Sequence, residues 1–176
     1  MKNTLVIHPK DETTVMLKYV YANHPEWTVC EDNGISRNEL MELISKHDRI
    51  IMLGHGTPYG LINSKRTGFL IDDSYAELLR NKETVSIWCY SHEYFLRNKL
   101  PGFHTGMIIS EVGEEHMVLG EAPLDERQIY INMINFSKVI SECIEMPPRE
   151  MRKYVLEHYT GQDAVTCFNR NNIYVV

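Results

Sequence analysis

Short apolar runs alternate with amphipathic segments along most of this chain, and the alternation predicts its secondary structure. Each run is rich in Ile, Val or Leu, which is typical of strands buried in a parallel sheet. The predicted strands are residues 4–8, 27–30, 49–53, 84–88 and 105–110. Helices are expected over residues 12–22, from Ser36, from Asp72 or Asp73 to about residue 80, and from near His92, where Ser91 can cap the helix. Ser36 with Glu39 three residues later is a capping-box pattern.

Two further patterns complete the predicted architecture. Residues 60–71 contain two apolar pieces around a polar turn, which indicates a small β-hairpin at the rim of the sheet. Beyond Gly120 the chain is predicted to be mainly helical, with one helix ending at Pro147-Pro148 and another over 149–158. An apolar stripe marks the first of these helices: Ile129, Met133, Phe136, Ile140 and Ile144. Residues 164–168 and 173–176 are expected to be final strands.

Strand–helix alternation predicts an α/β fold, a three-layer sandwich with a mostly parallel central sheet. The chain of 176 residues fits one domain, residues 1–176, whose helical part, residues 121–160, packs on the sheet. The formal net charge of −6 and the lack of a Lys/Arg stripe argue against a nucleic-acid partner.

Localisation is predicted from what the sequence lacks. No segment approaches the roughly 20 apolar residues that cross a bilayer, so no membrane partner is expected. The first apolar stretch is too short for a signal peptide. The four cysteines show no CxxC spacing. Together these features predict a cytoplasmic protein with reduced thiols.

Candidate chemistry lies where two predicted strands end. Residues 49–53 lead into Gly54-His55-Gly56, and residues 84–88 lead into Cys89. Because carboxyl ends of neighbouring parallel strands meet at one edge, His55 and Cys89 are predicted to face each other. His55 could accept the thiol proton, and a helix starting after Cys89 would lower the thiol pKa. Gly56 could offer its N–H to a developing oxyanion.

These residues resemble the caspase-like cysteine peptidases, which include caspases, gingipains, clostripain, legumain and separase. In that family one strand ends in His-Gly and the next core strand ends in the nucleophilic Cys, as His55-Gly56 and Cys89 do here. The resemblance covers residues 4–111. It implies a caspase-hemoglobinase-like fold and a cysteine endopeptidase acting on a peptide or protein substrate. The implied dyad is His55 and Cys89, with the N–H groups of Gly56 and Cys89 as oxyanion donors.

The sequence departs from the family pattern around Cys89. Many members carry a small residue before the nucleophile and a glycine after it, whereas here Trp88 precedes Cys89 and Tyr90 follows. An inactive caspase-like domain that serves as a binding or interaction module is therefore the alternative function. That alternative predicts that Trp88 or Tyr90 covers the cleft, or that Cys89 points into the core.

The substrate pocket is predicted beside the nucleophile, with Trp88 and Glu111 as its candidate residues. Glu111, Glu114 and Glu115 follow the predicted strand 105–110, so they lie near the same edge of the sheet. Acidic residues there would favour a basic substrate residue. The competing interpretation is a loop of solvated glutamates.

Other interpretations of these residues compete with the dyad. His8, His55, Cys89 and His92 would converge on one edge if the strand order were two-one-three-four, and such ligands suit zinc, although their spacing matches no known zinc pattern. His92 is also an alternative base for Cys89. A flavodoxin-like binding domain ranks third because residues 8–11 lack the glycines of a phosphate loop. We therefore expect no metal and no cofactor, and the oligomeric state stays open.

Overall fold

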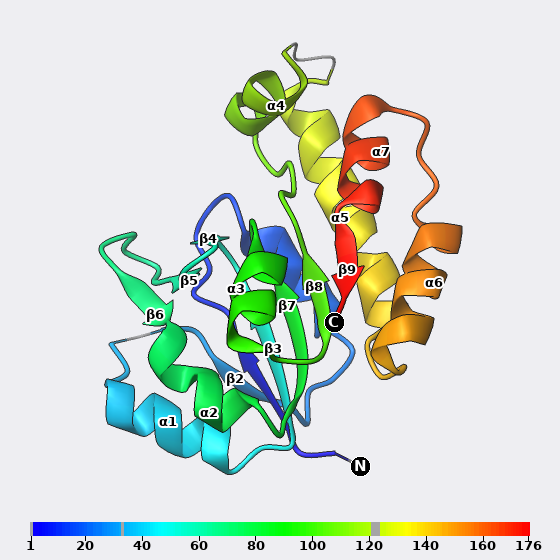
Figure 1. Ribbon diagram of the computed structural model, residues 1–176. Coiled ribbons are helices and arrows are strands. Elements are labelled where there is room, and N and C mark those ends of the chain that lie inside the picture. The colour runs from blue at the N-terminus through cyan, green and yellow to red at the C-terminus, as the bar shows by residue number, and fades with distance from the viewer. Residues whose placement is uncertain (1, 33, 121–123) are drawn as a thin grey trace.

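A six-stranded, mostly parallel sheet forms the centre of the computed structural model, which describes residues 2–32, 34–120 and 124–176 (Figure 1). The strand order is β2-β1-β3-β7-β8-β9, and only β9 runs antiparallel to its neighbour. The strands span Thr4–Ile7 (β1), Thr28–Cys30 (β2), Arg49–Leu53 (β3), Glu83–Ile87 (β7), Phe103–Thr105 (β8) and Ile173–Val175 (β9). The α/β class and the mostly parallel central sheet predicted from the sequence are confirmed.

Helices cover both faces of this sheet, which makes three layers (Figure 1). Alternate residues of β3 show the division. Ile51 and Leu53 pack with the helices η1 (Val15–Val20), α5 (Glu126–Cys143) and α6 (Pro148–His158). Ile50 and Met52 pack on the opposite side with α1 (Arg37–Ser45), α2 (Ala76–Leu79) and α3 (Ser91–Asn98). Since successive side chains of a strand point to opposite faces, a strand buried on both sides must be apolar throughout, as β3 is.

The predicted hairpin is confirmed as part of a second, three-stranded antiparallel sheet. Its strands are β4 (Gly56–Thr57), β5 (Gly60–Ile62) and β6 (Phe69–Ile71), in that order. Gly60 has φ +150°, and a Cβ there would lie 2.0 Å from the carbonyl oxygen of Ile71. Only glycine fits this turn, which brings the polar tip of the hairpin beside the carboxyl edge of the main sheet.

Several local predictions are also confirmed. The Ser36 hydroxyl accepts from the N–H of Glu39 at 3.3 Å, and the Glu39 carboxylate accepts from the N–H of Ser36 at 2.8 Å, so the capping box is formed. Asp72 caps the short helix η2 (Asp73–Tyr75) by accepting from the N–H of Ser74. The apolar stripe of α5 is buried against the sheet. The helical part expected over 121–160 corresponds to α5 and α6, and its first three residues lie outside those described.

Four predicted elements are wrong in type or extent. Residues 164–168 are not a strand but open helix α7 (Ala164–Asn171), because Asp163 caps that helix by accepting from the N–H of Thr166 at 2.8 Å. The strand expected over 105–110 is β8 and ends at Thr105. The helix expected over 12–22 is the shorter 3₁₀ helix η1. Ser91 does not cap α3, since its hydroxyl donates to the carbonyl of Thr105 in the chain interior.

The amino-terminal edge of the sheet holds a buried ion pair. Arg49, at the start of β3, donates to the carboxylate of Glu83 at the start of β7, with Nε at 2.7 Å. The Arg49 side chain is 3% exposed, and Lys2 also pairs with Glu83. A buried guanidinium without its carboxylate would be strongly destabilising, so this pair helps to fix the register of β3 against β7.

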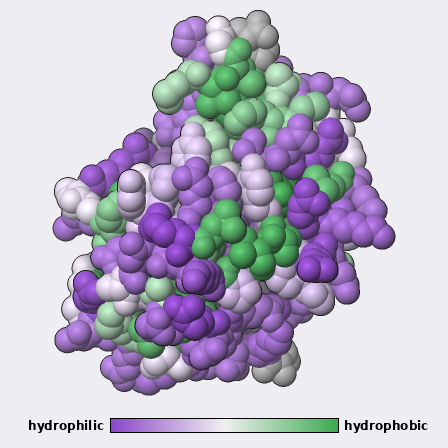
Figure 2. All heavy atoms as spheres, in the orientation of Figure 1, coloured by the Kyte–Doolittle hydropathy of each residue, from purple (hydrophilic) through white to green (hydrophobic). Residues whose placement is uncertain are grey.

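The visible surface is mainly polar, with an apolar patch over α4 (Val112–Leu119) at the top of the view (Figure 2). Met117 is 75% exposed, and Val112 is also exposed. None of the described helices is long and apolar enough to cross a membrane.

Candidate functional site

His55 and Cys89 line one small cavity at the carboxyl edge of the sheet. His55 follows β3, and Cys89 lies two residues after the end of β7, the neighbouring parallel strand. The cavity has a volume of about 20 Å³, and Thr13, Ile108 and Ser110 also line it. A space of this size holds about one water molecule. The geometry thus brings together the two residues that the strand-end argument singled out.

The Nε2 atom of His55 is surrounded by polar groups from three other segments. It lies 2.7 Å from the Thr13 hydroxyl, 2.8 Å from Nη2 of Arg66 and 3.3 Å from Oδ2 of Asp11. Glu111 is next, with a carboxylate oxygen at 4.0 Å. The other ring nitrogen, Nδ1, has no hydrogen-bond partner among the described residues. His55 is therefore fixed through Nε2, and Nδ1 makes no competing contact with the described residues.

Asp11 is the anionic centre of this arrangement. Its Oδ1 accepts from the N–H and hydroxyl groups of Thr13 and Thr14 at 3.0–3.1 Å, and its Oδ2 accepts from Nε and Nη2 of Arg66. Burial alone would raise the pKa of Asp11, but these hydrogen bonds, with His55 nearby, hold it well below its usual range. Asp11 is therefore ionised wherever the protein is folded near neutral pH, and it can stabilise a positive charge on His55.

The thiol of Cys89 is neutral in this structure, which corrects the expectation of a lowered pKa. Burial of the sulfur, together with the charges of Glu114 and Glu111, raises the pKa of Cys89 to about 12. A contact of Sγ with the carbonyl of Ile108 at 3.6 Å acts in the opposite direction but is too weak to offset them. Helix α3 does follow Cys89, since it begins at Ser91, but its positive end does not outweigh the burial of the sulfur.

Trp88 fills the space beside Gly56. Its indole is 1% exposed and packs against Gly56, where an added Cβ would lie 2.0 Å from Cδ1 of the ring. The ring nitrogen donates to the carbonyl of Thr57 at 3.2 Å. Trp88 thus lines the cavity, and its indole fits there because residue 56 is a glycine without a Cβ.

The backbone around Cys89 has two distinctive features. Tyr90 has φ +66°, the left-handed conformation that glycine adopts without strain. The N–H of Cys89 has no acceptor among the described residues, which leaves it open to a ligand oxygen. Gly56 begins β4 and pairs with Leu61 of β5.

The three glutamates after β8 occupy different environments. Glu111 is half-buried and faces His55 and Arg66. Glu114 accepts from the backbone N–H groups of Ser110 and Glu111, so it stabilises the start of α4. Glu115 is buried, and one of its oxygens accepts from the N–H of Leu124. Of the three, Glu111 is the one that lies within 4.0 Å of His55, while the charge of Glu114 also acts on the Cys89 thiol.

The zinc alternative finds no support in the described residues, among which no group of three or more His, Cys, Asp or Glu side chains could hold a metal ion. The strand order needed for it is present, but His8 is buried and bonds to Tyr21 and to the carbonyl of Thr14. His92 stacks on Tyr174 of β9. Both histidines are thus held away from the cavity that His55 and Cys89 line.

Sequence reasoning missed Asp11, Thr13 and Arg66. A signal for the first two exists in the run Asp11-Glu12-Thr13-Thr14, because Asp followed by Thr two and three residues later is typical of a side-chain-capped turn. Arg66 gives no such signal. It lies in the hairpin tip with φ +55°, and only the tertiary fold brings it to His55.

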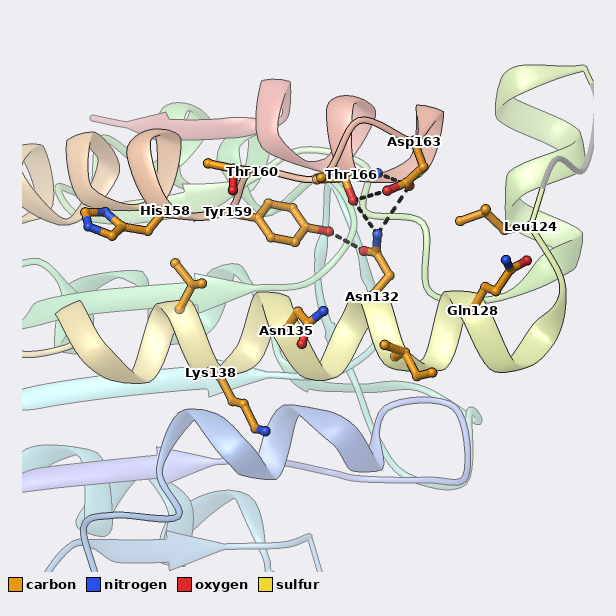
Figure 3. Close-up of a pocket in the computed structure, with 13 residues that line it drawn as sticks. Leu124, Gln128, Asn132, Asn135, Lys138, His158, Tyr159, Thr160, Asp163 and Thr166 are labelled. Atoms are coloured by element: carbon orange, nitrogen blue, oxygen red, sulfur yellow. Dashed lines mark hydrogen bonds between the residues drawn. The ribbon is translucent and has the colours of Figure 1, made fainter.

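A larger cavity lies elsewhere, between α5 and the segment joining α6 to α7 (Ala164–Asn171), with a volume of about 550 Å³ (Figure 3). Asn132 is the centre of its polar groups: it accepts from the Tyr159 hydroxyl and donates to the Thr166 hydroxyl at 2.5 Å, while Asp163 accepts from Thr166 at 2.7 Å. These groups satisfy one another's hydrogen-bonding capacity, so the network stabilises the packing of α5 against α7 and indicates no ligand.

In comparisons with known proteins, the chain matches no family model, no curated protein and no solved structure. The resemblance to caspase-like peptidases therefore stays a prediction from the sequence.

Proposed function

We propose that the chain is a cysteine peptidase of the caspase-like type, with Cys89 as nucleophile, His55 as general base and Asp11 as the residue that positions His55. The observation that carries the proposal is the shared cavity, which brings His55 and Cys89 together at the ends of two adjacent parallel strands. The same strand relation underlies the resemblance to the caspase-hemoglobinase fold.

The neutral thiol defines how the reaction would begin. Because the pKa of Cys89 is about 12, proton removal must accompany attack rather than precede it. Sγ attacks the peptide carbonyl carbon while its proton passes to Nδ1 of His55, and the N–H of Cys89 stabilises the oxyanion. The C–N bond then breaks, the amine leaves with the proton from His55, and water hydrolyses the thioester. Asp11 stabilises the imidazolium formed between these steps.

Arg66 sets the resting state of this machinery. A guanidinium can only donate, so its contact with Nε2 requires that Nε2 carry no proton. Asp11 and His55⁺ require the opposite, with Nε2 donating to the carboxylate. Displacement of Arg66 would therefore favour the proton on Nε2 and leave Nδ1 as the base. The exposed position of Arg66, 52% for its side chain, allows such a displacement.

A reducing, cytoplasmic setting belongs to the proposal, because Cys89 must remain a free thiol. All four cysteines of the chain are free in the structure: Cys30, Cys89, Cys143 and Cys167.

The test is cleavage of a fluorogenic peptide library by the wild type, Cys89→Ala and the matched control Cys167→Ala. Cys167 is also partly buried but lies on α7, away from the cavity. We expect cleavage by the wild type and the control, and a loss of about a thousandfold or more in Cys89→Ala. A library cleaved equally by Cys89→Ala, or by none of the three proteins, would overturn the peptidase proposal.

A second candidate function is a caspase-like binding module without catalysis, favoured by the raised thiol pKa and by the contact of Arg66 with His55. In that case the edge of the sheet would hold a peptide without cutting it. Trapping of a thioester between Cys89 and a peptide, detected as a mass increase of the protein, separates the two candidates, because a binding module forms none.

A further inference from the structure

A fully buried histidine lies beside the edge strand β9. His104 is the middle residue of β8, which lies between β7 and β9 (Figure 1). Across the sheet, His104 is in register with Ser86 of β7 and with Tyr174 of β9. Helix α3 covers both rings. Its Phe95 stacks on His104 at 3.9 Å, and its His92 stacks on Tyr174 at 4.3 Å. His104 is thus enclosed by two strands and one helix.

The surroundings of His104 suit a neutral imidazole and not a charged one. Its Nδ1 lies 2.8 Å from the Ser86 hydroxyl, and its Nε2 is buried with no hydrogen-bond partner among the described residues. A protonated imidazole donates from both nitrogens, so protonation would leave a buried N–H unpaired.

The neighbouring ionisable groups do not offset this cost. They are His92 on α3 and Tyr174 on β9, while β7 contributes the hydroxyl of Ser86. Burial, and after it the charge of His92, lower the pKa of His104 from 6.5 to about 3. No carboxylate of the described residues acts on this pKa in the opposite direction.

Strand β9 is the most exposed side of this enclosure. Helix α3 is held to the sheet by the Ser91 hydroxyl, which lies 3.2 and 2.9 Å from the carbonyl oxygens of Ser86 and Thr105. By contrast, β9 is a three-residue strand at the edge of the sheet, and the side chain of Tyr174 is partly exposed. Elements with few buried contacts open locally at a lower free energy than central strands do. Opening of β9 would remove Tyr174 and give His104 access to water.

The start of β9 also supports the backbone next to the candidate site. The N–H of Gly106, directly after β8, donates to the carbonyl of Asn172 at 2.8 Å. The carbonyl of Gly106 accepts from the N–H of Tyr90 at 3.0 Å. Two residues further on, the carbonyl of Ile108 lies 3.6 Å from Sγ of Cys89. Release of β9 would therefore loosen the backbone beside Cys89.

We propose that β9 is an acid-sensitive latch: protonation of His104 opens the strand, and this opening couples low pH to the backbone beside Cys89. The ring is neutral while β9 is closed, and it binds a proton with its ordinary pKa of 6.5 once β9 is open. The closed form is therefore favoured above about pH 6.5 and becomes less favoured as the pH falls, so the opening constant should rise about twentyfold between about pH 7 and pH 5. The latch goes beyond the proposed function and does not depend on it.

Hydrogen exchange of peptides from β9 and β3, followed by mass spectrometry at about pH 7, 6 and 5, tests the latch. The quantity compared is the protection factor, which is the exchange rate of the unfolded chain divided by that of the folded protein at the same pH. The variants are His104→Gln and the matched control His8→Gln. His8 is also fully buried, and its burial lowers its pKa to about 4. It follows β1, which β3 and β7 separate from β8.

In the wild type we expect β9 to be less protected than β3, and its protection to fall about twentyfold from about pH 7 to pH 5. In His104→Gln the fall should be about threefold or less, because the titrating ring is absent. In His8→Gln the fall should equal that of the wild type, because opening of β9 does not expose His8.

Three results would overturn the latch. They are equal protection of β9 and β3 in the wild type, a fall in His104→Gln as large as in the wild type, and a fall that shrinks in His8→Gln, which indicates unfolding of the whole chain. If His104→Gln does not fold, an NMR titration of the His104 ring in the wild type replaces it. A pKa near 6.5 overturns the latch, whereas a ring still neutral at about pH 5, with β9 less protected than β3, supports it.

Discussion

Replacement of Gly56 by alanine tests whether the indole of Trp88, which follows β7, packs directly against Gly56, which follows β3. The added Cβ would lie 2.0, 2.5 and 2.7 Å from Cδ1, Cγ and Nε1 of Trp88, where about 3.5 Å or more is needed. The indole has little room to move, because the ring centroids of Tyr94 and Phe95 lie 5.8 and 5.9 Å from that of Trp88. The indole nitrogen also donates to the carbonyl of Thr57. We therefore expect a cost at the upper end of overpacking, about 3 kcal/mol.

Urea unfolding followed by circular dichroism measures this cost, and a melting temperature lower by roughly 6–12 °C should accompany it. Gly113→Ala is the matched control, since nothing lies within 4 Å of its added Cβ and its stability should equal or exceed that of the wild type. In a double-mutant cycle, Gly56→Ala should cost less in a Trp88→Leu background than in the wild type, because the ring is the clashing group. Gly56→Ala as stable as the wild type, or an equal cost in the two backgrounds, would refute the argument.

Three further changes test the electrostatics and the buried polar contacts. The pKa of Asp11 is lowered on folding, so ionised Asp11 stabilises the folded protein above about pH 4, and this contribution is lost as the pH falls. In urea unfolding, Asp11→Asn should therefore lose less stability than the wild type between about pH 7 and pH 3. Equal losses in the two proteins would contradict this. Glu83→Gln leaves the buried guanidinium of Arg49 without its carboxylate and should cost about 3 kcal/mol, whereas a cost below about 1 kcal/mol in chemical denaturation would refute a buried ion pair. Asn132→Ala removes the acceptor of the Tyr159 hydroxyl and should cost about 1–3 kcal/mol in the same assay, with an unchanged unfolding midpoint as the contrary result.

The central sheet could be predicted because burial on both faces forces apolar runs such as 49–53, which carry their own signal. The prediction fails where an apolar run is compatible with both a strand and a helix. Residues 164–168 form a short apolar run, and such a run fits a buried strand as well as one side of a helix. The deciding feature was Asp163, a helix cap that the apolar pattern does not include.

The site was predictable only in part, for a comparable reason. His55 and Cys89 follow apolar strands, so the parallel sheet locates them. Asp11 and Arg66 reach the site from a turn and a hairpin tip, and no local pattern ties either to His55. The thiol pKa was predicted in the wrong direction because it depends on burial and on Glu114 and Glu111, whose orientation is set by tertiary structure.

The most direct test of the account is the rate of Cys89 alkylation by iodoacetamide at about pH 7, compared between the wild type and His55→Ala by peptide-resolved mass spectrometry. A thiol whose pKa is about 12 reacts very slowly at that pH unless a base removes its proton during attack. Since general-base catalysis contributes about a hundredfold or more, the account predicts a wild-type rate higher than that of His55→Ala by about that factor. Equal rates in the two proteins, both rising only at alkaline pH, would contradict a working dyad of His55 and Cys89.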